Sequence, residues 1–275
     1  MTNQRQPFYP WPERLRDFGF KKSYILKDLF YKKKLAELKI SPGMRVLDVG
    51  CGQGVFLDRL IESYRVRAVG VDIVPEIIGE AKRKSKRGQF MVADALNLPF
   101  SSHSFDLVIS LDTLEHIDDQ NRAMREMVRV LKDGGVLFIY VLSKKRQFTF
   151  NRLQFIFFKF LGWDLQQKFG HQPKLFLEEE KIKDFAKKNK IKILSILPFH
   201  SFFTNFFDFI LLTNFWLFSK LGFFRSEKLG KMVLTFGDIV CRLVYYPLWI
   251  LDFPWRIFGQ GNGLLFVGRK DNEET

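Results

Sequence analysis

Three acidic residues in the first half of the chain, Asp48, Asp72 and Asp94, lie within or at the end of short apolar runs. A carboxylate at the tip of a strand can accept hydrogen bonds from both hydroxyl groups of a ribose. Two histidines, His116 and His171, are candidates for removing a proton from a reacting group. These residue types suit a site that binds a nucleotide-like cofactor and carries out proton transfer beside it.

A strand, a glycine turn and a helix follow one another around the first carboxylate. The apolar run 46–49 predicts a buried strand, residues 50–54 read Gly-Cys-Gly-Gln-Gly, and the pattern of 55–61 predicts a helix. Glycine lets the backbone turn sharply and approach a ligand closely. The spacing differs from the G-x-G-x-x-G pattern that seats a pyrophosphate. The segment therefore predicts a cofactor cradle of another kind, in which Cys51 is a small spacer and not a nucleophile.

The remaining elements of an α/β sheet follow in order. Apolar runs predict further strands, and amphipathic patterns predict helices between them, one of which is expected to stop at the glycines of 132–135. The expected strands are 68–73, 90–94, 104–110, 136–141, 191–197 and 263–269, and the later expected helices are 120–131 and 178–189.

This ordered pattern over 46–141 resembles the class I S-adenosylmethionine (SAM) methyltransferases and is close to their small-molecule and quinone members. The resemblance implies a doubly wound, Rossmann-like α/β fold with a seven-stranded sheet and an antiparallel last strand. It also implies that SAM is the cofactor and that its contacts are Asp48, Gly50, Cys51, Gly52, Gly54, Asp72, Ile73, Asp94, Ala95 and Leu111. The alternative is an α/β domain that binds a different nucleotide.

Methyl transfer from a sulfonium is an in-line displacement, so the protein mainly orients the two partners. An oxygen or carbon nucleophile must also lose a proton. His116 follows Glu115 at the end of the fourth strand, beside the place where the resemblance puts the methyl group. His171 opens a segment that is similar to the His-x-x-x-Leu-Phe segment of many of these enzymes. Each is a candidate base, and for each a purely structural histidine is the alternative.

The residues after the fourth strand also raise the question of a metal. Asp112, Glu115 and His116 are similar to the Glu-x-x-Glu-His segment of quinone O-methyltransferases, which can hold a divalent cation. Two oxygen ligands and one imidazole would suit Mg²⁺, Mn²⁺ or Zn²⁺. Aspartate in place of the first glutamate shortens the reach, so the main expectation is that no metal is used.

The charge balance restricts the partners. The formal net charge is +14, and basic residues cluster in 21–34 and 82–87. Such clusters fit nucleic acid, an anionic membrane surface or a solvated face. Adenine-N6 methyltransferases resemble one another in an Asn/Asp-Pro-Pro-aromatic turn after strand four, whereas this chain has Asp-Thr-Leu-Glu-His over 112–116. Nucleic acid is therefore the disfavoured partner.

The second half of the chain is rich in phenylalanine. Of 32 phenylalanines, 23 follow residue 147. Exposed apolar surface on this scale is typical of a membrane or partner face. The expected organisation is a basic helical segment (1–45), a SAM-binding core (46–141), a substrate lid (142–177), the end of the methyltransferase fold (178–198 and 263–275) and an apolar, membrane-associating insertion (199–262).

The insertion interrupts the place where a tight hairpin is expected. A hairpin turn needs two to five residues, but about 65 residues separate the two expected strands. Both apolar extensions are expected to leave from the carboxyl ends of parallel strands, which is the ligand-binding edge of open α/β sheets. The apolar material is therefore expected to overhang the mouth of the site.

One polar stripe runs along the second half of the insertion at helical spacing, with aliphatic residues opposite. The pattern, together with prolines 247 and 254, favours a helix lying in the plane of the membrane, with aromatic rings at headgroup level. A spanning hairpin and a soluble lid or dimer interface are the alternatives. The stripe is Asp238, Arg242, Tyr245, Trp249, Asp252 and Arg256, and the expected interfacial rings are Tyr245, Tyr246, Trp249 and Trp255.

The sequence thus predicts a SAM-dependent methyltransferase for a hydrophobic or lipid-linked acceptor, such as a prenylated quinone or a glycolipid. Residues 1–17 lack the apolar run of a signal peptide, and the two cysteines lie far apart, so a cytoplasmic protein associated with the membrane surface is expected. A soluble methyltransferase for a small molecule and a non-catalytic SAM-binding scaffold are the alternatives. No oligomeric state is predicted.

Overall fold

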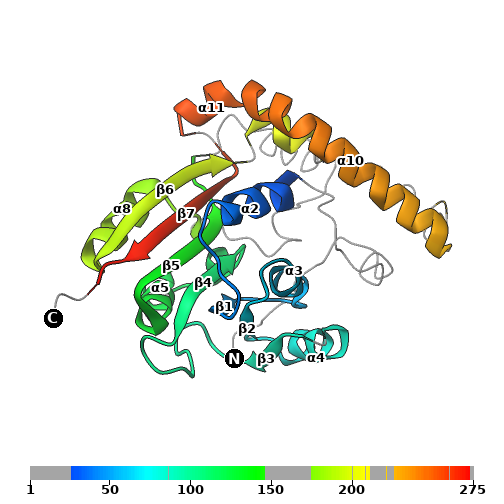
Figure 1. Cartoon of the computed structure of the whole chain (residues 1–275). Coiled ribbons are helices and arrows are strands. Elements are labelled where there is room, and N and C mark those ends of the chain that lie inside the picture. The colour runs from blue at the N-terminus through cyan, green and yellow to red at the C-terminus, as the bar shows by residue number, and fades with distance from the viewer. Residues whose placement is uncertain are drawn as a thin grey trace. The chain divides into compact units, whose positions relative to one another are not determined.

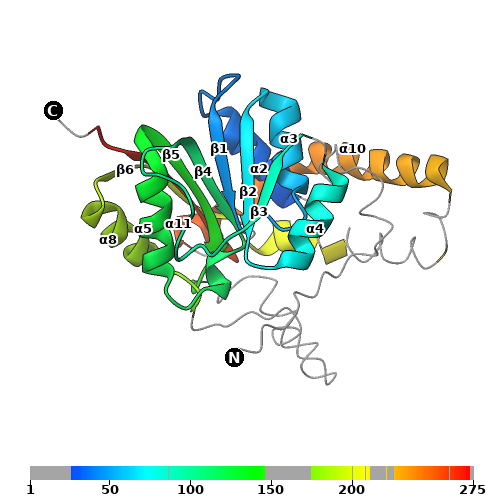
Figure 2. The same ribbon diagram turned by 90° about the horizontal axis from the view of Figure 1, so that it is seen from below.

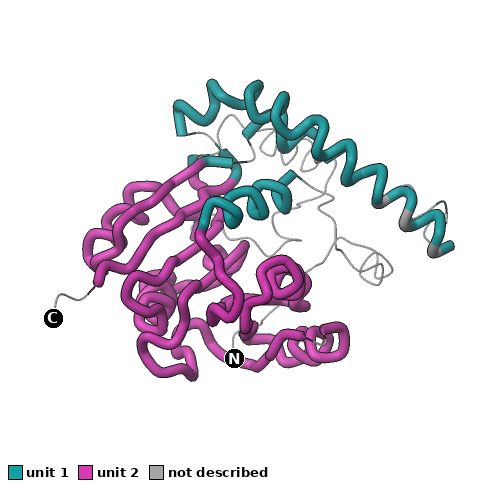
Figure 3. Tube along the Cα trace, in the orientation of Figure 1, with its two compact units in different colours: residues 1–38, 145–171, 198–262 teal, residues 39–144, 172–197, 263–275 magenta. Residues whose placement is uncertain are grey.

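The computed structural model describes residues 26–85, 87–145, 175–199, 201–207, 209–210, 221, 226–259 and 261–272. The chain divides into two compact units, which are coloured separately in Figure 3. Unit 2 comprises 39–144, 172–197 and 263–275, and unit 1 comprises 1–38, 145–171 and 198–262.

Unit 2 is built on one sheet of seven strands in the order β3-β2-β1-β4-β5-β7-β6 (Figure 1). Strands β1 to β5 pair in parallel, and β7 runs antiparallel to β5. The predicted seven-stranded sheet with an antiparallel last strand is thereby confirmed. The strands are β1 (Arg45–Val49), β2 (Arg67–Asp72), β3 (Gln89–Val92), β4 (Phe105–Leu111), β5 (Leu131–Leu142), β6 (Ile191–Phe199) and β7 (Gly263–Lys270).

Helices cover both faces of this sheet. Figure 2 shows α3 (Val55–Tyr64) and α4 (Pro75–Lys84) on one face and α5 (Gln120–Val130) and α8 (Glu179–Lys188) on the other. The central strands β1, β4, β5 and β7 are largely buried on both sides, which explains their continuous apolar runs in place of alternation. The sheet therefore leaves its polar groups at the strand ends.

The helix predicted over 120–131 is shorter than expected. It ends at Val130, and residues 132–135 belong to β5 and do not form the expected glycine stop. Leu131 already pairs with Phe105, and the register then shifts before Leu107. The glycines at 134–135 thus lie in the irregular part of the β4–β5 pair and not at the end of a helix.

The long connection between β6 and β7 is confirmed. β6 ends at Phe199 and β7 begins at Gly263, which pairs with the last residue of β5, Leu142. Because β7 is antiparallel to β5, the connection returns to the sheet at the carboxyl ends of the parallel strands.

Unit 1 combines an N-terminal helix with the second half of the insertion. Its elements are α2 (Leu26–Ala36), α10 (Glu227–Leu251) and α11 (Phe253–Ile257). Phe30 of α2 stacks on Phe199 with ring centroids 4.0 Å apart, and Trp249 of α10 lies 5.7 Å and 5.8 Å from these two rings. The aromatic stack therefore joins segments that lie more than two hundred residues apart along the chain.

Three residues of the polar stripe lie on the packed side of α10, whereas the side chain of Arg242 is about half exposed. Asp238, Tyr245 and Asp252 are all buried. This differs from the expectation that the Tyr245 ring sits at headgroup level. Pro247 does not interrupt the helix, which continues to Leu251, whereas Pro254 lies in the first turn of α11. Among the described residues, one helical segment, Lys228–Leu251, is long and apolar enough by length and composition to cross a membrane.

Candidate cofactor and acceptor site

The glycine turn after β1 is fastened to β2. The backbone N–H groups of Gly50 and Cys51 both donate to the carbonyl oxygen of Val71, at 2.8 and 2.9 Å. Gly50 has a φ of 80°, and a Cβ added there would lie 2.1 Å from the Oγ1 of Thr113. Glycine is therefore required twice over at this position, by conformation and by space.

The Asp72 carboxylate, at the end of β2, is held by the turn it faces. Its Oδ2 accepts a hydrogen bond from the N–H of Gly52 at 3.1 Å, and its Oδ1 accepts one from the N–H of Val74 at 3.0 Å. Each carboxylate oxygen has a second lone pair available to a ligand hydroxyl. Ile73, the next residue, exposes nearly half of its apolar side chain. The pair suits a ribose and the flat ring attached to it.

Asp94 emerges at the same edge of the sheet. β3 runs parallel to β2, with Val92 paired to Asp72, so the residues that follow both strands lie at neighbouring ends. The Oδ1 of Asp94 accepts a hydrogen bond from the N–H of Leu96 at 2.8 Å, while Ala95 is buried. The structure thus brings together the second and third predicted carboxylates.

Asp48 differs from these two because it is buried. Burial, together with the nearby charge of Asp72, raises the pKa of Asp48 to about 7. A cation placed at this edge would favour the ionised form of the carboxyl. Burial also raises the pKa of the Cys51 thiol, which fits the expected role of this residue as a spacer.

The ring of Phe90 fills space that three glycines leave around it. A Cβ added at Gly54 would lie 2.4 Å from the ring, and one added at Gly88 would lie 2.8 Å from it. A Cβ at Gly70 would meet both Phe90 at 2.9 Å and the Sγ of Cys51 at 2.8 Å. The Phe90 ring of β3 therefore packs against the glycine turn at Gly54.

The segment after β4 packs directly against the glycine turn. The Thr113 hydroxyl donates to the carbonyl oxygens of Leu111 at 3.1 Å and Val49 at 3.3 Å. Asp112, just before it, has a left-handed φ of 52°, and its N–H donates to the Tyr140 carbonyl. Such a conformation is uncommon for a residue other than glycine and marks a tightly specified turn.

This turn positions the candidate base. A short 3-10 helix, η1 (Leu114–His116), follows; Glu115 in it is fully buried, and His116 is exposed. The Nε2 group of Gln120 donates to the carbonyl oxygens of Leu114 at 2.7 Å and Leu175 at 2.5 Å. The imidazole of His116 is therefore carried on a braced turn that begins at the last residue of β4, Leu111.

Sequence reasoning did not identify Thr113 or Gln120. Both act by contacts to backbone atoms or to the space above a glycine, and such contacts leave no pattern of charged residues. His171 lies outside the described residues, so its placement stays a prediction. In the described part of the chain, no three His, Cys, Asp or Glu side chains come together as a metal site, and Asp112, Glu115 and His116 do not form one.

Comparison with known proteins agrees with this site. The family described as a methyltransferase domain matches residues 47–139. Norajmaline N-methyltransferase from Rauvolfia serpentina is 34% identical over 100 residues, which are 34% of this chain and 34% of that protein. A probable tRNA methyltransferase 9B from Homo sapiens is 36% identical over 109 residues, 38% of this chain and 23% of that protein. The chain thus matches about a third or less of the length of these relatives.

Solved structures share the fold. Phosphoethanolamine N-methyltransferase 2 from Haemonchus contortus, in complex with SAM, superposes with a TM-score of 0.59 at 19% identity, over 90% of this chain and 52% of that one. The [4+2]-cyclase SpnF superposes with a TM-score of 0.58 at 19% identity, over 90% of this chain and 81% of that one.

The sheet order and the carboxylates at the strand ends define a nucleotide-cofactor-binding α/β domain. The matched family assigns this domain further: residues 47–139 form a methyltransferase domain of the class I SAM-dependent type, and SAM is its cofactor. The residues present fit that group, because Asp72 offers a positioned carboxylate for the ribose diol, Ile73 offers an apolar face, and the buried Asp48 would be stabilised as an anion by a sulfonium or ammonium.

Proposed function

We propose that this methyltransferase acts on the hydroxyl group or a carbon atom of a hydrophobic or lipid-linked acceptor, such as a prenylated quinone or a glycolipid, at a membrane surface. One observation carries the proposal, namely the uneven distribution of exposed apolar side chains. In unit 2 the exposed large apolar residues are Ile73, Val92, Ile193 and Leu194, and all others that the structure describes belong to unit 1. An acceptor that resides in lipid would be met by such a surface.

SAM supplies an activated methyl group when it is bound. Asp72 and Asp94 orient the cofactor at the sheet edge, and Thr113 keeps the turn that carries His116 against the glycine turn. His116 takes the proton of the acceptor, since it is the exposed titratable side chain on that turn. His171 is the alternative base.

Two other functions have support of their own. A soluble small-molecule methyltransferase is favoured by the match to an enzyme named for norajmaline. A role without methyl transfer is the second, because a protein named as a cyclase shares this fold. Turnover must therefore be measured and not only binding.

The deciding experiment is mass spectrometry of lipid and quinone extracts from a strain that lacks the gene. The expected result is one hydrophobic compound that loses a single methyl group. Wild-type protein should restore the methyl group, and the Asp72→Ala variant should restore much less. A change confined to water-soluble metabolites would instead establish the soluble methyltransferase, and no change in methylation would favour the role without methyl transfer.

A further inference from the structure

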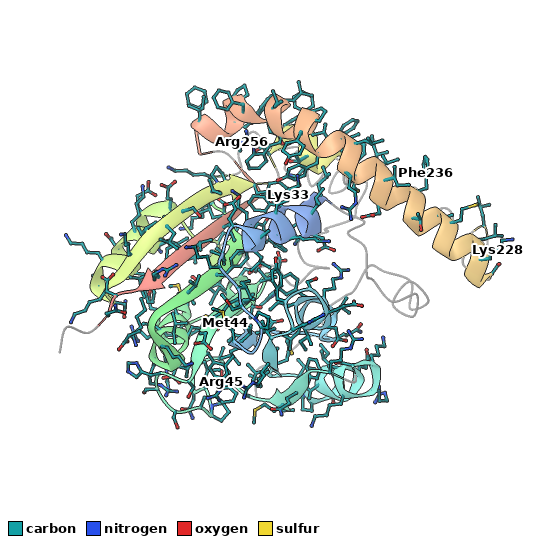
Figure 4. All side chains as sticks on the ribbon, viewed as in Figure 1. Lys33, Met44, Arg45, Lys228, Phe236 and Arg256 are labelled. Atoms are coloured by element: carbon teal, nitrogen blue, oxygen red, sulfur yellow. The ribbon has the colours of Figure 1, made fainter. Side chains whose placement is uncertain are left out.

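The outward side of α10 carries an apolar stripe at regular helical spacing. Its exposed side chains recur at steps of four and three residues, which places them on one face. Figure 4 shows Phe236 on the side of α10 that points away from Lys33 of α2. We call this the outer stripe; it comprises Met232, Phe236, Ile239, Leu243, Tyr246 and Ile250.

Exposure along the outer stripe is high. Phe236 exposes 68% and Leu243 exposes 71% of its surface, and Phe253 and Ile257 continue the apolar face into α11 at more than half exposure each. Contiguous apolar surface of this extent is unusual for a soluble monomer. It predicts an apolar environment outside the protein.

The opposite side of α10 is fixed by polar contacts. Asp252 accepts hydrogen bonds from the N–H groups of Phe203 and Thr204 at 2.8 and 3.1 Å and from the Thr204 hydroxyl at 2.6 Å. Asp238 accepts two from the Arg242 guanidinium at 3.0 and 3.1 Å. Charged groups of this kind are expensive to place in hydrocarbon. This side cannot face lipid while these contacts hold, so α10 meets lipid along one side only.

Cations border the outer stripe. The Lys33 ammonium lies 3.7 Å from the ring centroid of Tyr246, and the Arg256 guanidinium lies 3.5 Å from that of Trp249. The Arg242 side chain is about half exposed. Both acids whose side chains the structure describes in α10 and at its end, Asp238 and Asp252, are buried. The exposed charges that the structure describes on α10 and α11 are therefore positive and complement anionic headgroups.

We infer that α10 and α11 lie flat in the surface of an anionic bilayer, with the outer stripe inserted between acyl chains and the cations of Lys33, Arg242 and Arg256 at headgroup level. The inference rests on the proposed function and gives it a defined membrane-binding surface. The bilayer is favoured over a second copy of the chain, because a broad apolar face extends beyond a coiled-coil seam: Leu251, Phe253 and Phe258 are also exposed. A protein with a net charge of +14 also repels its own copies.

The test measures depth in the membrane. Cysteine is introduced separately at Met232, Phe236, Leu243 and Ile250 of the full-length protein, and each variant is nitroxide-labelled and bound to vesicles of phosphatidylglycerol and phosphatidylcholine. All four labels should report one shallow depth by paramagnetic relaxation with oxygen and a water-soluble nickel complex. A depth that rises to a maximum at the middle positions and falls at both ends would mean a spanning helix and overturn the inference. The protein without an added cysteine gives the background, since both native cysteines are buried.

Paired substitutions test the stripe itself. Phe236→Asp with Leu243→Asp should lower the partition onto these vesicles by roughly 10- to 100-fold. The matched control is Ile193→Asp with Leu194→Asp, which makes the same change of charge on exposed apolar residues of unit 2 and should leave partition nearly unchanged. Equal loss in both variants would overturn the inference, as would a dimer in lipid-free solution that the first variant converts to a monomer.

Calorimetry with SAM separates this inference from the proposed function. The variant with Phe236→Asp and Leu243→Asp should bind SAM with the wild-type affinity, because its two substitutions lie in unit 1 and the cofactor residues lie in unit 2. If vesicle binding behaves as expected but no hydrophobic compound is methylated, the proposed acceptor is wrong and the membrane surface stands. If methylation of a hydrophobic compound is found without vesicle binding, the membrane surface is wrong.

Discussion

The two units of this chain distribute polar and apolar groups in opposite ways. In unit 2 the central apolar strands are buried on both faces, and carboxylates such as Asp72 lie at the sheet edge, where a ligand can reach them. In α10 of unit 1 the carboxylates of Asp238 and Asp252 are buried, and rings such as Phe236 point outward. The difference shows that one chain can keep its apolar groups inside and its carboxylates accessible in one unit, and do the reverse on a helix of the other.

The largest effect is expected for the candidate base His116, which lies in unit 2. His116→Ala should lower kcat by roughly 10²–10⁴ and leave SAM affinity nearly intact, because proton removal and cofactor binding use different residues. Turnover of the identified acceptor measures the first quantity and calorimetry the second. His103→Ala is the control, since His103 contacts Asp133 at 3.1 Å away from the glycine turn. Unchanged turnover in the first variant would transfer the role to His171.

A buried carboxylate also makes the stability of unit 2 depend on pH. The folded pKa of Asp48 is about 7 and its ordinary value is 3.8, so the folded state holds this proton more tightly than the unfolded state. The contribution of Asp48 to the free energy of unfolding therefore falls as pH rises from about 4 to 7. Asp48→Asn removes the ionisation and should stabilise the cofactor-free protein by up to about 4 kcal/mol above pH 7, with little gain near pH 4.

Urea unfolding at both ends of that pH range measures this difference, with Asp271→Asn on the exposed C-terminal segment as the control. The same difference in the free energy of unfolding at both pH values would contradict the assignment of the raised pKa to Asp48.

The comparison of the two units is sharpened by a carboxylate of unit 1. Asp252→Ala leaves two backbone N–H groups and one hydroxyl without their acceptor, which should destabilise the packing of α10 and α11 by about 3 kcal/mol. Hydrogen exchange should accelerate in α10 and α11 and stay unchanged in β1, β4 and β5. Equal acceleration in the sheet would show that the two units unfold together.

The smallest expected effect is on cofactor affinity. Asp72→Ala should weaken SAM binding by about 1.5–3 kcal/mol, the magnitude for lost hydrogen bonds to a charged group. Partition onto anionic vesicles should be unchanged. Asp184→Ala, on the exposed side of α8, is the matched control for calorimetry. A loss of vesicle binding in Asp72→Ala would mean that the two units do not act separately.

Much of unit 2 could be predicted from the sequence. Parallel strands buried on both faces give continuous apolar runs, and the turn at Gly50 requires glycine, so the order of strands and the positions of Asp72 and Asp94 were recoverable. The start of β5 was not, because a register shift against Phe105 depends on pairing between segments 26 residues apart and not on local pattern.

Less of unit 1 could be predicted, for a physical reason. Periodicity shows that α10 has two faces but does not show which face is packed. That depends on distant partners: the acceptor atoms of Asp252 meet donors on Phe203 and Thr204, and Tyr245 lies below the Lys33 ammonium of α2. Likewise, Thr113 was missed as the side chain above Gly50, since nothing near it in sequence signals that contact.

The ring of Phe90 also constrains how this sequence can diverge over evolutionary time. This ring alone prevents alanine at position 88, where glycine now stands. A lineage that first replaced Phe90 by valine would therefore become free to carry alanine there. Position 70 would stay restricted until Cys51 also became smaller, and position 54 would remain glycine throughout because its φ is 76°. Substitutions around this ring are therefore expected to be ordered, with Phe90 changing before Gly88 and Gly70.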